Sequence, residues 1–187
     1  MRKSVELREK FAVSFPKSTL AGRNLDDLGK LYESFADYRK AAEAYEQLVA
    51  WDKARSYAGT ADALYNAALF RESLGEGAKA IVNFQTYARD FASRDDAHLA
   101  ALQVGRIYEA DKRAVEAMAA YKQYFSNPAM AGKGPDALFD ARLRYGRLLR
   151  GQRQNDSAQA HFQESVALYD RMAKGGTTFQ IAPLYIA

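Results

Sequence analysis

The sequence of 187 residues contains no cysteine and only two histidines, His98 and His161. The lack of cysteine excludes disulfides, thiolate nucleophiles and Cys-ligated metals, and two histidines exclude a multi-histidine metal site. With 12 glycines and 4 prolines, turn-rich β folds, collagen-like and low-complexity classes are disfavoured. No apolar run approaches the roughly 20 residues that cross a bilayer, and MRKSVELREK has no apolar signal-peptide core. These absences leave the cellular compartment open.

The residues that favour β-strands are also scarce. The sequence has 7 Val, 4 Ile and 5 Thr against 35 Ala. Alanine is the best helix former, whereas β-branched residues are enriched in strands. The apolar share of 48% argues against a disordered chain. The composition therefore predicts an all-α protein.

One short pattern occurs four times along the chain. A small residue is followed twelve positions later by alanine, and four positions after that by an aromatic residue. Constant spacing within units that follow one another at 39, 37 and 41 residues is typical of stacked helical hairpins joined by variable loops. The four sets are Gly29/Ala41/Tyr45, Ala68/Ala80/Phe84, Gly105/Ala117/Tyr121 and Gly146/Ala158/Phe162.

Apolar residues three or four positions apart predict two helices in each unit. Glycine inside a helix costs roughly 1 kcal/mol relative to alanine. Gly29 and Gly105 therefore predict a close approach of the partner helix backbone, with the aromatic residue filling the space beside it. The predicted helices span 18–35 and 38–51, 57–74 and 77–91, 95–110 and 113–126, and 136–151 and 155–173.

These residues resemble the tetratricopeptide repeat (TPR) family. The resemblance implies a right-handed superhelix of antiparallel hairpins. Two residues depart from the family pattern: Arg71 replaces the usual tyrosine in the second unit, and Arg142 replaces an apolar residue in the fourth. The first unit matches best, through Leu25, Leu28, Gly29, Tyr32, Ala41 and Tyr45.

The resemblance divides the chain into repeats at 17–53, 54–92, 93–128 and 134–174. Residues 1–16 read as the second helix of a preceding repeat and 175–187 as the start of a following one, so we interpret the sequence as a fragment of a longer array. Units longer than the usual TPR length, with junction sequences such as SFPKSTLAGRNLDDLG and DFASRDDAHLAALQVG, are similar to those of Gram-negative envelope proteins, including outer-membrane assembly lipoproteins and the Tol–Pal coordinator. A periplasmic or outer-membrane location is predicted on that basis, with the cytoplasm as the alternative.

The resemblance implies a non-catalytic scaffold that binds a partner peptide or helix in a concave groove lined by the first helices. The groove changes from acidic at its beginning to basic at its end, which would orient an extended partner. The alternative interpretation is that these residues are the solvated faces of amphipathic helices. The candidate groove residues are Asp26, Asp27, Lys30 and Glu33; Tyr65, Asn66, Leu69 and Glu72; Gln103 and Arg106; and Arg144, Arg147 and Arg150.

Other functional classes have little support in the sequence. No catalytic, cofactor-binding or metal-binding residue is predicted, and no nucleic-acid partner is expected, because the basic residues concentrate in one unit. Of the five residues in the chaperone-docking clamp of the family, Asn66 alone matches. Two alternatives remain: a structural subunit that uses convex faces or self-associates through its ends, and a regulatory region of a larger enzyme. Acidic peptides, carboxylates or phosphates would suit the cluster Arg142, Arg144, Arg147, Arg150 and Arg153.

Overall fold

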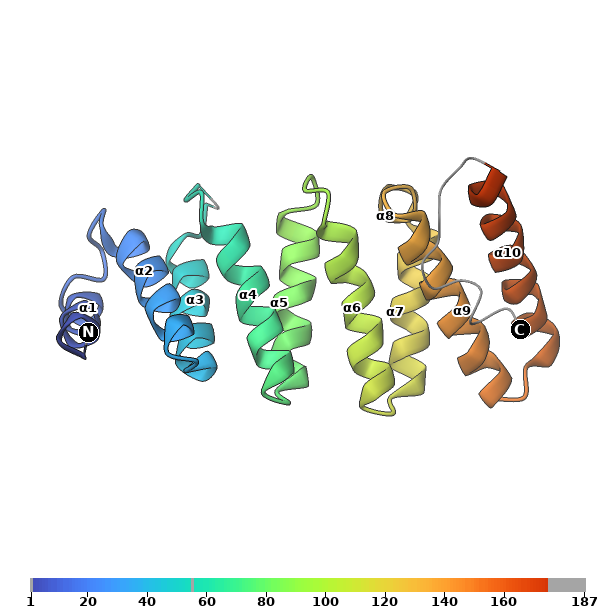
Figure 1. The fold of residues 1–187 in the computed structure, drawn as a ribbon, viewed down its shortest axis with the longest axis horizontal. Helices are drawn as coiled ribbons and strands as arrows, with labels where there is room; N and C mark the ends of the chain where they lie inside the picture. The colour runs from blue at the N-terminus through green and yellow to red at the C-terminus, as the bar shows by residue number, and fades with distance from the viewer. Residues whose placement is uncertain (1, 55, 175–187) are drawn as a thin grey trace. The chain divides into compact units, whose positions relative to one another are not determined.

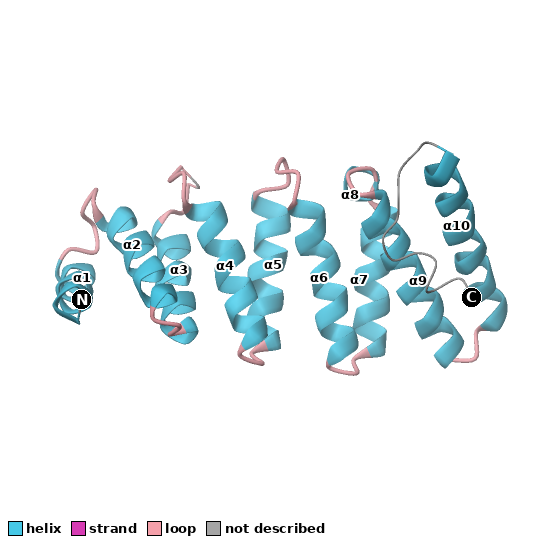
Figure 2. Cartoon of the chain, in the orientation of Figure 1, coloured by secondary structure: helices cyan, strands magenta, loops and turns pink. Residues whose placement is uncertain are grey.

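The computed structural model describes residues 2–54 and 56–174, and within them every regular element is a helix (Figures 1 and 2). The chain divides into two compact units, residues 1–92 with helices α1–α5 and residues 93–187 with α6–α10. The helices are α1 (Arg2–Ser14), α2 (Ala21–Ser34), α3 (Tyr38–Trp51), α4 (Thr60–Ser73), α5 (Gly77–Asp90), α6 (Ala97–Ala110), α7 (Ala114–Ser126), α8 (Pro128–Ala131), α9 (Pro135–Gly151) and α10 (Asn155–Lys174).

Eight of these helices pair as four hairpins. In the first unit α2 packs on α3 and α4 on α5, and in the second α6 packs on α7 and α9 on α10. Successive hairpins also touch, because α3 contacts α4 and α7 contacts α9. The all-α fold of repeated hairpins is therefore confirmed. The predicted start of a following repeat at 175–187 lies outside the described residues.

The repeated small residue makes room for the aromatic ring of its own hairpin. A Cβ added to Gly29 would lie 2.3 Å from Cε1 of Tyr45, and one added to Gly105 would lie 2.4 Å from Cε1 of Tyr121. Both tyrosines are at most 1% exposed. The sequence-based explanation was therefore wrong in detail. The ring, rather than the backbone of the second helix, is the group that lies against the glycine.

Each hairpin turns through one residue in the left-handed conformation, at the same repeat position. The φ angles are +57° at Ala36, +73° at Gly75, +60° at Lys112 and +62° at Arg153. The next amide donates a hydrogen bond to the carbonyl five residues earlier, as from Asp37 N to Tyr32 O at 3.0 Å. This arrangement is the Schellman motif, which satisfies the last carbonyls of a helix and favours glycine at the left-handed position.

We expect Ala36→Gly to raise the free energy of unfolding by about 0.5–1 kcal/mol, because the left-handed strain of a non-glycine residue outweighs the entropy of glycine. The matched change Gly75→Ala should lower it by about 1 kcal/mol, since nothing lies within 4 Å of the added Cβ and the cost comes from the backbone alone. Denaturant unfolding measures the change in the free energy of unfolding of each variant relative to wild type. Equal effects of the same sign would contradict this account.

Three first helices begin later than predicted, at 21, 60 and 97 instead of 18, 57 and 95. The loop before α4 shows the reason. The carboxylate of Asp52, 4% exposed, accepts hydrogen bonds from the amides of Ser56 and Tyr57, both at 3.0 Å, and from Thr60 Oγ1 at 2.6 Å. Because one buried side chain binds these groups, residues 56–59 stay outside the helix.

The short helix α8 was not predicted. The side chain of Asn127 accepts a hydrogen bond from the amide of Ala129 at 3.0 Å, and Pro128 occupies the first helical position, where it is well tolerated. Lys133 Nζ then donates to the carbonyl of Arg94 at 2.6 Å. A Cβ on Gly134 would lie 2.4 Å from Nε2 of His98. His98 is therefore a packing residue that fits the α8–α9 loop against the start of α6.

Candidate partner-binding face

The candidate groove residues lie on the first helices, α2 and α4 in the first unit and α6 and α9 in the second, and we call the surface that these helices present in each unit its first-helix face. In the first unit, the acidic groups of α2 have partners within the chain. Asp26, 7% exposed, accepts from Lys30 Nζ at 2.9 Å and from the hydroxyl of Tyr57 at 3.0 Å. Asp27 pairs with Arg8 at 3.0 Å. Burial, and then the hydrogen bond to Asp26, raises the pKa of Tyr57 to about 12, so its hydroxyl remains a donor.

Glu33 supports the core from this face. Its Oε2 accepts a hydrogen bond from the hydroxyl of Tyr45 at 3.0 Å. Burial, reinforced by Glu33, raises the pKa of Tyr45 well above its usual value, and Asn66 also hydrogen-bonds to this tyrosine. Glu33 and Asn66 thus hold the buried ring that fills the first hairpin.

The remaining candidates on α4 differ in exposure. Tyr65 is half-buried and packs edge-on against Phe84 and Tyr87, with ring centroids 5.7 Å and 5.1 Å away. Glu72 is half-buried, whereas Leu69 is 40% exposed. Tyr65 therefore belongs to the packing of α4 on α5, and Leu69 offers the exposed apolar contact of this helix.

In the second unit, ion pairs join the first helices of successive hairpins. Asp140 on α9 accepts from Nε and Nη2 of Arg106 on α6 at 3.1 Å and 2.8 Å, and from Nε of Arg144 at 2.9 Å. Arg106 also donates to Gln103 at 3.3 Å. One carboxylate thus holds two arginines from two helices.

A second link runs in the opposite direction. Glu109 on α6 accepts from Nη1 of Arg144 at 3.0 Å and from the hydroxyl of Tyr121 at 2.7 Å. Burial alone would lower the pKa of Arg144, but Asp140 and Glu109 outweigh it and raise the pKa. Arg144 therefore stays charged. It links α9 to α6 through Glu109, which also binds the buried Tyr121 of the third hairpin.

The five arginines predicted as one cluster do not share one surface. Arg142 pairs with Glu164 on α10, and its guanidinium lies 5.1 Å from the ring centre of Phe125. It therefore points away from the first-helix face. Arg153 belongs to the hairpin turn. Arg147 and Arg150 are the exposed arginines of α9, and the guanidinium of Arg150 lies 5.8 Å from the ring centre of Phe162 on α10.

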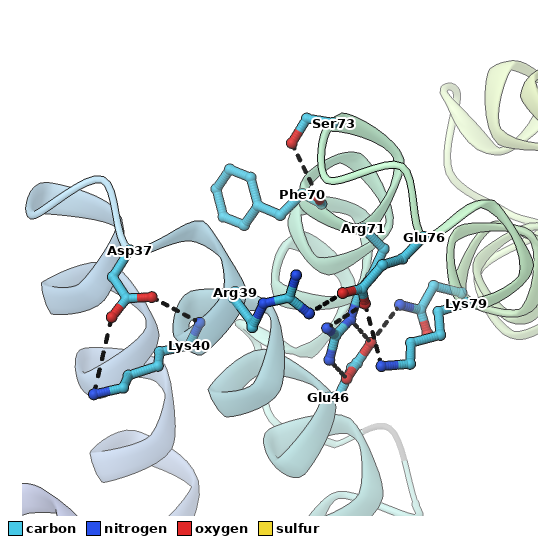
Figure 3. A network of polar contacts seen from close by, with 10 residues as sticks. Asp37, Arg39, Lys40, Glu46, Phe70, Arg71, Ser73, Glu76 and Lys79 are labelled. Carbon is cyan, nitrogen blue, oxygen red and sulfur yellow. Dashed lines mark hydrogen bonds and ion pairs between the residues drawn. The ribbon is translucent and has the colours of Figure 1, made fainter.

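Sequence reasoning missed the polar network around Arg71 (Figure 3). Arg71 is only 2% exposed and donates to both oxygens of Glu46 on α3, at 2.9 Å and 2.6 Å. Its Nη1 also bonds Glu76 at 2.7 Å, and Glu76 contacts Arg39 and Lys79 as well. The signal that could have found it is the arginine at the family's tyrosine position. Opposite charges one repeat apart, as for Arg106 and Asp140, would similarly have predicted the pairs of the second unit.

The described part of the chain offers few groups for chemistry. No cluster of three or more His, Asp or Glu side chains within it is arranged to hold a metal ion. His161 packs against the rings of Phe125 and Tyr145, with centroids 5.3 Å and 4.7 Å away, and burial followed by the charge of Arg142 lowers its pKa. Across residues 2–54 and 56–174, no helix is both long and apolar enough to cross a bilayer.

Comparison with known proteins gives similarity in structure without similarity in sequence. No family model and no curated protein matches the sequence. The chain is similar to the crystal structure of MamA, with a TM-score of 0.59 and 20% identity over 91% of this chain and 89% of that one. It is also similar to YrrB, a TPR protein, with a TM-score of 0.54 and 15% identity over 89% and 80% of the two chains.

The fold is a TPR-like helical repeat. BtubC from P. vanneervenii is a third similar structure, with a TM-score of 0.59 and 16% identity over 96% of this chain and 76% of that one. At these identities the similarity establishes the fold alone. The site residues on the first-helix face therefore stay predictions.

Proposed function

We propose that this TPR-like protein is a non-catalytic scaffold that binds an acidic segment of a partner protein on the first-helix face of its second unit. The observation that carries the proposal is the pair of cross-repeat links, Arg106–Asp140 and Arg144–Glu109, with Arg147 and Arg150 exposed on the same helix. The links hold α6 and α9 in one geometry before any partner arrives. A rigid surface loses less entropy on binding.

The chemistry of the exposed groups selects the partner. Guanidinium groups bind carboxylates and phosphates through paired hydrogen bonds. Arg106 and Arg144 donate hydrogen bonds to Asp140 and Glu109, and Arg147 and Arg150 are the exposed arginines of α9. YrrB, which has a similar fold, is described as a TPR protein with an unusual peptide-binding site. That description is consistent with our proposal of a peptide segment as the partner.

We expect the double charge reversal Arg147→Glu/Arg150→Glu to weaken the binding of short labelled peptides rich in Asp and Glu by about tenfold or more. Fluorescence anisotropy measures the affinity, and circular dichroism checks that the variant is folded. Arg153→Glu is the matched control, because it reverses a charge in the adjacent turn, off the first-helix face. Equal affinity of wild type and the double variant, or equal binding of lysine-rich peptides, would reject the proposal.

Arg144 is unsuitable for this test even though it was a candidate contact. Reversing its charge would leave Asp140 and Glu109 facing a new carboxylate, so a loss of binding would report a loss of structure. The variant should be used as a stability control instead.

An alternative is a structural subunit of a larger assembly that works through its convex faces and ends, and the exposure of Leu7 on α1 and of Phe15, 67% and 57%, favours it. A regulatory region of an enzyme is a third possibility. A periplasmic or outer-membrane setting stays a prediction that rests on the junction sequences. Fractionation of cells that express the full-length gene product tests that location, and a soluble cytoplasmic product would reject it.

A further inference from the structure

His161 on α10 lies where the third and fourth hairpins meet. Its ring packs against Phe125 of α7 and Tyr145 of α9, and α9 packs on both α7 and α10 (Figure 1). These contacts lie between residues 125 and 161, so they do not depend on any chain beyond the described residues. We propose that His161 is a pH-sensitive switch, whose protonation weakens the packing of α10 on α9 and α7.

One ring nitrogen of His161 is buried without a hydrogen bond. Among the described residues, no group bonds its Nδ1 atom, which has almost no exposed surface. Oε2 of Glu164, on the same helix, is 3.7 Å away, which is too far for a hydrogen bond. A neutral imidazole carries a proton on one nitrogen only, whereas an imidazolium carries N–H donors on both. Protonation therefore places a charge in a packed site where one donor lacks an acceptor, and this costs free energy.

The charges around His161 also oppose a further positive charge. Burial, followed by the charge of Arg142 on α9, lowers the pKa of the imidazole. Glu164 already pairs with Arg142 and has a side chain 54% exposed, so it attracts an imidazolium only weakly. Burial, followed by the charge of Arg171 on α10, lowers the pKa of Arg142 as well. An imidazolium at this position thus joins two arginines beside one exposed carboxylate.

The second hairpin has a carboxylate partner for the same repeat position. The residue before the aromatic ring is Asn83 in that hairpin and His161 in the fourth. Asn83 donates a hydrogen bond to Glu46 of the preceding hairpin at 3.0 Å. At the repeat position of Glu46, α7 has Lys122, which is exposed. The carboxylate that binds the polar side chain in the second hairpin therefore has no counterpart at that position on α7.

The direction of the pH dependence follows from the lower pKa of folded His161. A histidine in an unfolded chain titrates with a pKa of about 6.5, so the unfolded chain takes up the proton first as pH falls. The packing is therefore most stable above about pH 7 and loses stability as pH drops from about 6.5 through the lower folded value. Carboxylates with ordinary pKa values titrate below this range, which makes the histidine response separable.

The test is hydrogen exchange of the intact chain at about pH 7.5 and about pH 5.5, corrected for the intrinsic exchange rates. We expect the protection of α10 amides to fall about threefold to tenfold at the lower pH in wild type. The variant His161→Phe keeps an aromatic ring against Phe125 and Tyr145 but has no group to protonate, so its protection should not change. His98→Asn is the matched control for the other histidine. Its amide can replace the contact of Nδ1 with the carbonyl of Asp95, and α10 should respond as in wild type.

A second variant tests the charges directly. Arg142→Gln removes the cation that acts on His161 and leaves Glu164 available to it, so the titration of His161 should move to higher pH and the response of α10 should shrink. Nuclear magnetic resonance of the imidazole Cε1–Hε1 signals follows this titration, and His161→Phe assigns the signal. If Arg142 served packing alone, its variant would lose protection equally at both pH values without moving the titration.

Two results would overturn the proposal. One is an equal loss of α10 protection on acidification in wild type and His161→Phe. The other is a His161 signal that titrates at or above the pKa of about 6.5 of an unperturbed histidine. Peptide binding forms no part of these measurements, so the switch and the first-helix face of the second unit succeed or fail separately.

Discussion

Replacing Arg71 with methionine is expected to lower the free energy of unfolding by about 3–5 kcal/mol, the range measured when one partner of a buried ion pair is removed. Arg71 is 2% exposed, and three of its nitrogens donate to Glu46 and Glu76. Methionine fills much of the same volume but leaves both carboxylates without their central cation. Urea unfolding followed by circular dichroism measures the loss.

The double variant Arg71→Met/Glu46→Leu separates the lost ion pair from lost packing. Apolar residues that replace both partners of a buried pair are often tolerated, so most of the stability should return. Arg39→Met is the matched control. It removes another cation from Glu76, but Arg39 has a side chain 54% exposed and should cost no more than about 1 kcal/mol. A single variant as stable as Arg39→Met would contradict the buried-pair argument.

The cost of Arg71→Met should also depend on pH. Burial raises the pKa of Glu46, but hydrogen bonds from Arg71 and Asn83 outweigh it, so the folded pKa is lower than usual. The stabilisation by Glu46 is therefore complete above the unfolded pKa of about 4.3 and is lost as pH falls through the lower folded value. The difference between wild type and the variant should shrink below about pH 4.

Gly105→Ala is expected to destabilise the second unit by about 2–3 kcal/mol, because the added Cβ would overlap a ring that has no room to move. The Cβ would lie 2.4 Å from Cε1 of Tyr121, a residue with no exposed surface. Its hydroxyl is also fixed by Glu109 at 2.7 Å. The helix propensity gained from alanine, about 1 kcal/mol, is smaller than this cost.

The second hairpin provides a natural comparison for this substitution. There Ala68 faces Phe84, a ring without a hydroxyl to fix it, and both residues are fully buried. Adding Tyr121→Phe to Gly105→Ala should therefore recover part of the loss. Gly151→Ala is the control, because nothing lies within 4 Å of its Cβ, and it should be neutral or slightly stabilising. Equal melting temperatures for the two alanine variants would refute the steric explanation.

The predictions for Gly105 and for Arg71 concern two kinds of contact, one within a hairpin and one between hairpins. Gly105 and Tyr121 belong to one hairpin, so their contact decides whether two helices close on each other. Arg71 and Glu46 belong to successive hairpins, so their ion pair decides how one hairpin sits on the next. The proposed binding face depends on the second kind of contact, because Arg106–Asp140 and Arg144–Glu109 also join hairpins.

The sequence alone determined the helical fold, the four hairpins and the repeat positions of the small and the aromatic residue, whereas the structure showed that the ring itself lies against the glycine. These features repeat at fixed spacing, and neighbours on a helix are set by its period of 3.6 residues. The hairpin turns were located from the same pattern. The start of α4 was predicted too early because the carboxylate of Asp52 accepts hydrogen bonds from the amides of Ser56 and Tyr57. A periodic pattern of apolar residues does not indicate such hydrogen bonds.

Only the tertiary structure decided how far each charged side chain is exposed. From the sequence, Arg144 and Arg147 were equivalent members of one basic face. In the structure Arg144 is tied to Asp140 and Glu109, whereas Arg147 is exposed. Likewise, Leu7 and Ala41 occupy the same repeat position, but one is exposed and the other is buried. The physical reason is that pairing and burial depend on residues about one repeat away in the sequence, and packing between helices decides whether they meet.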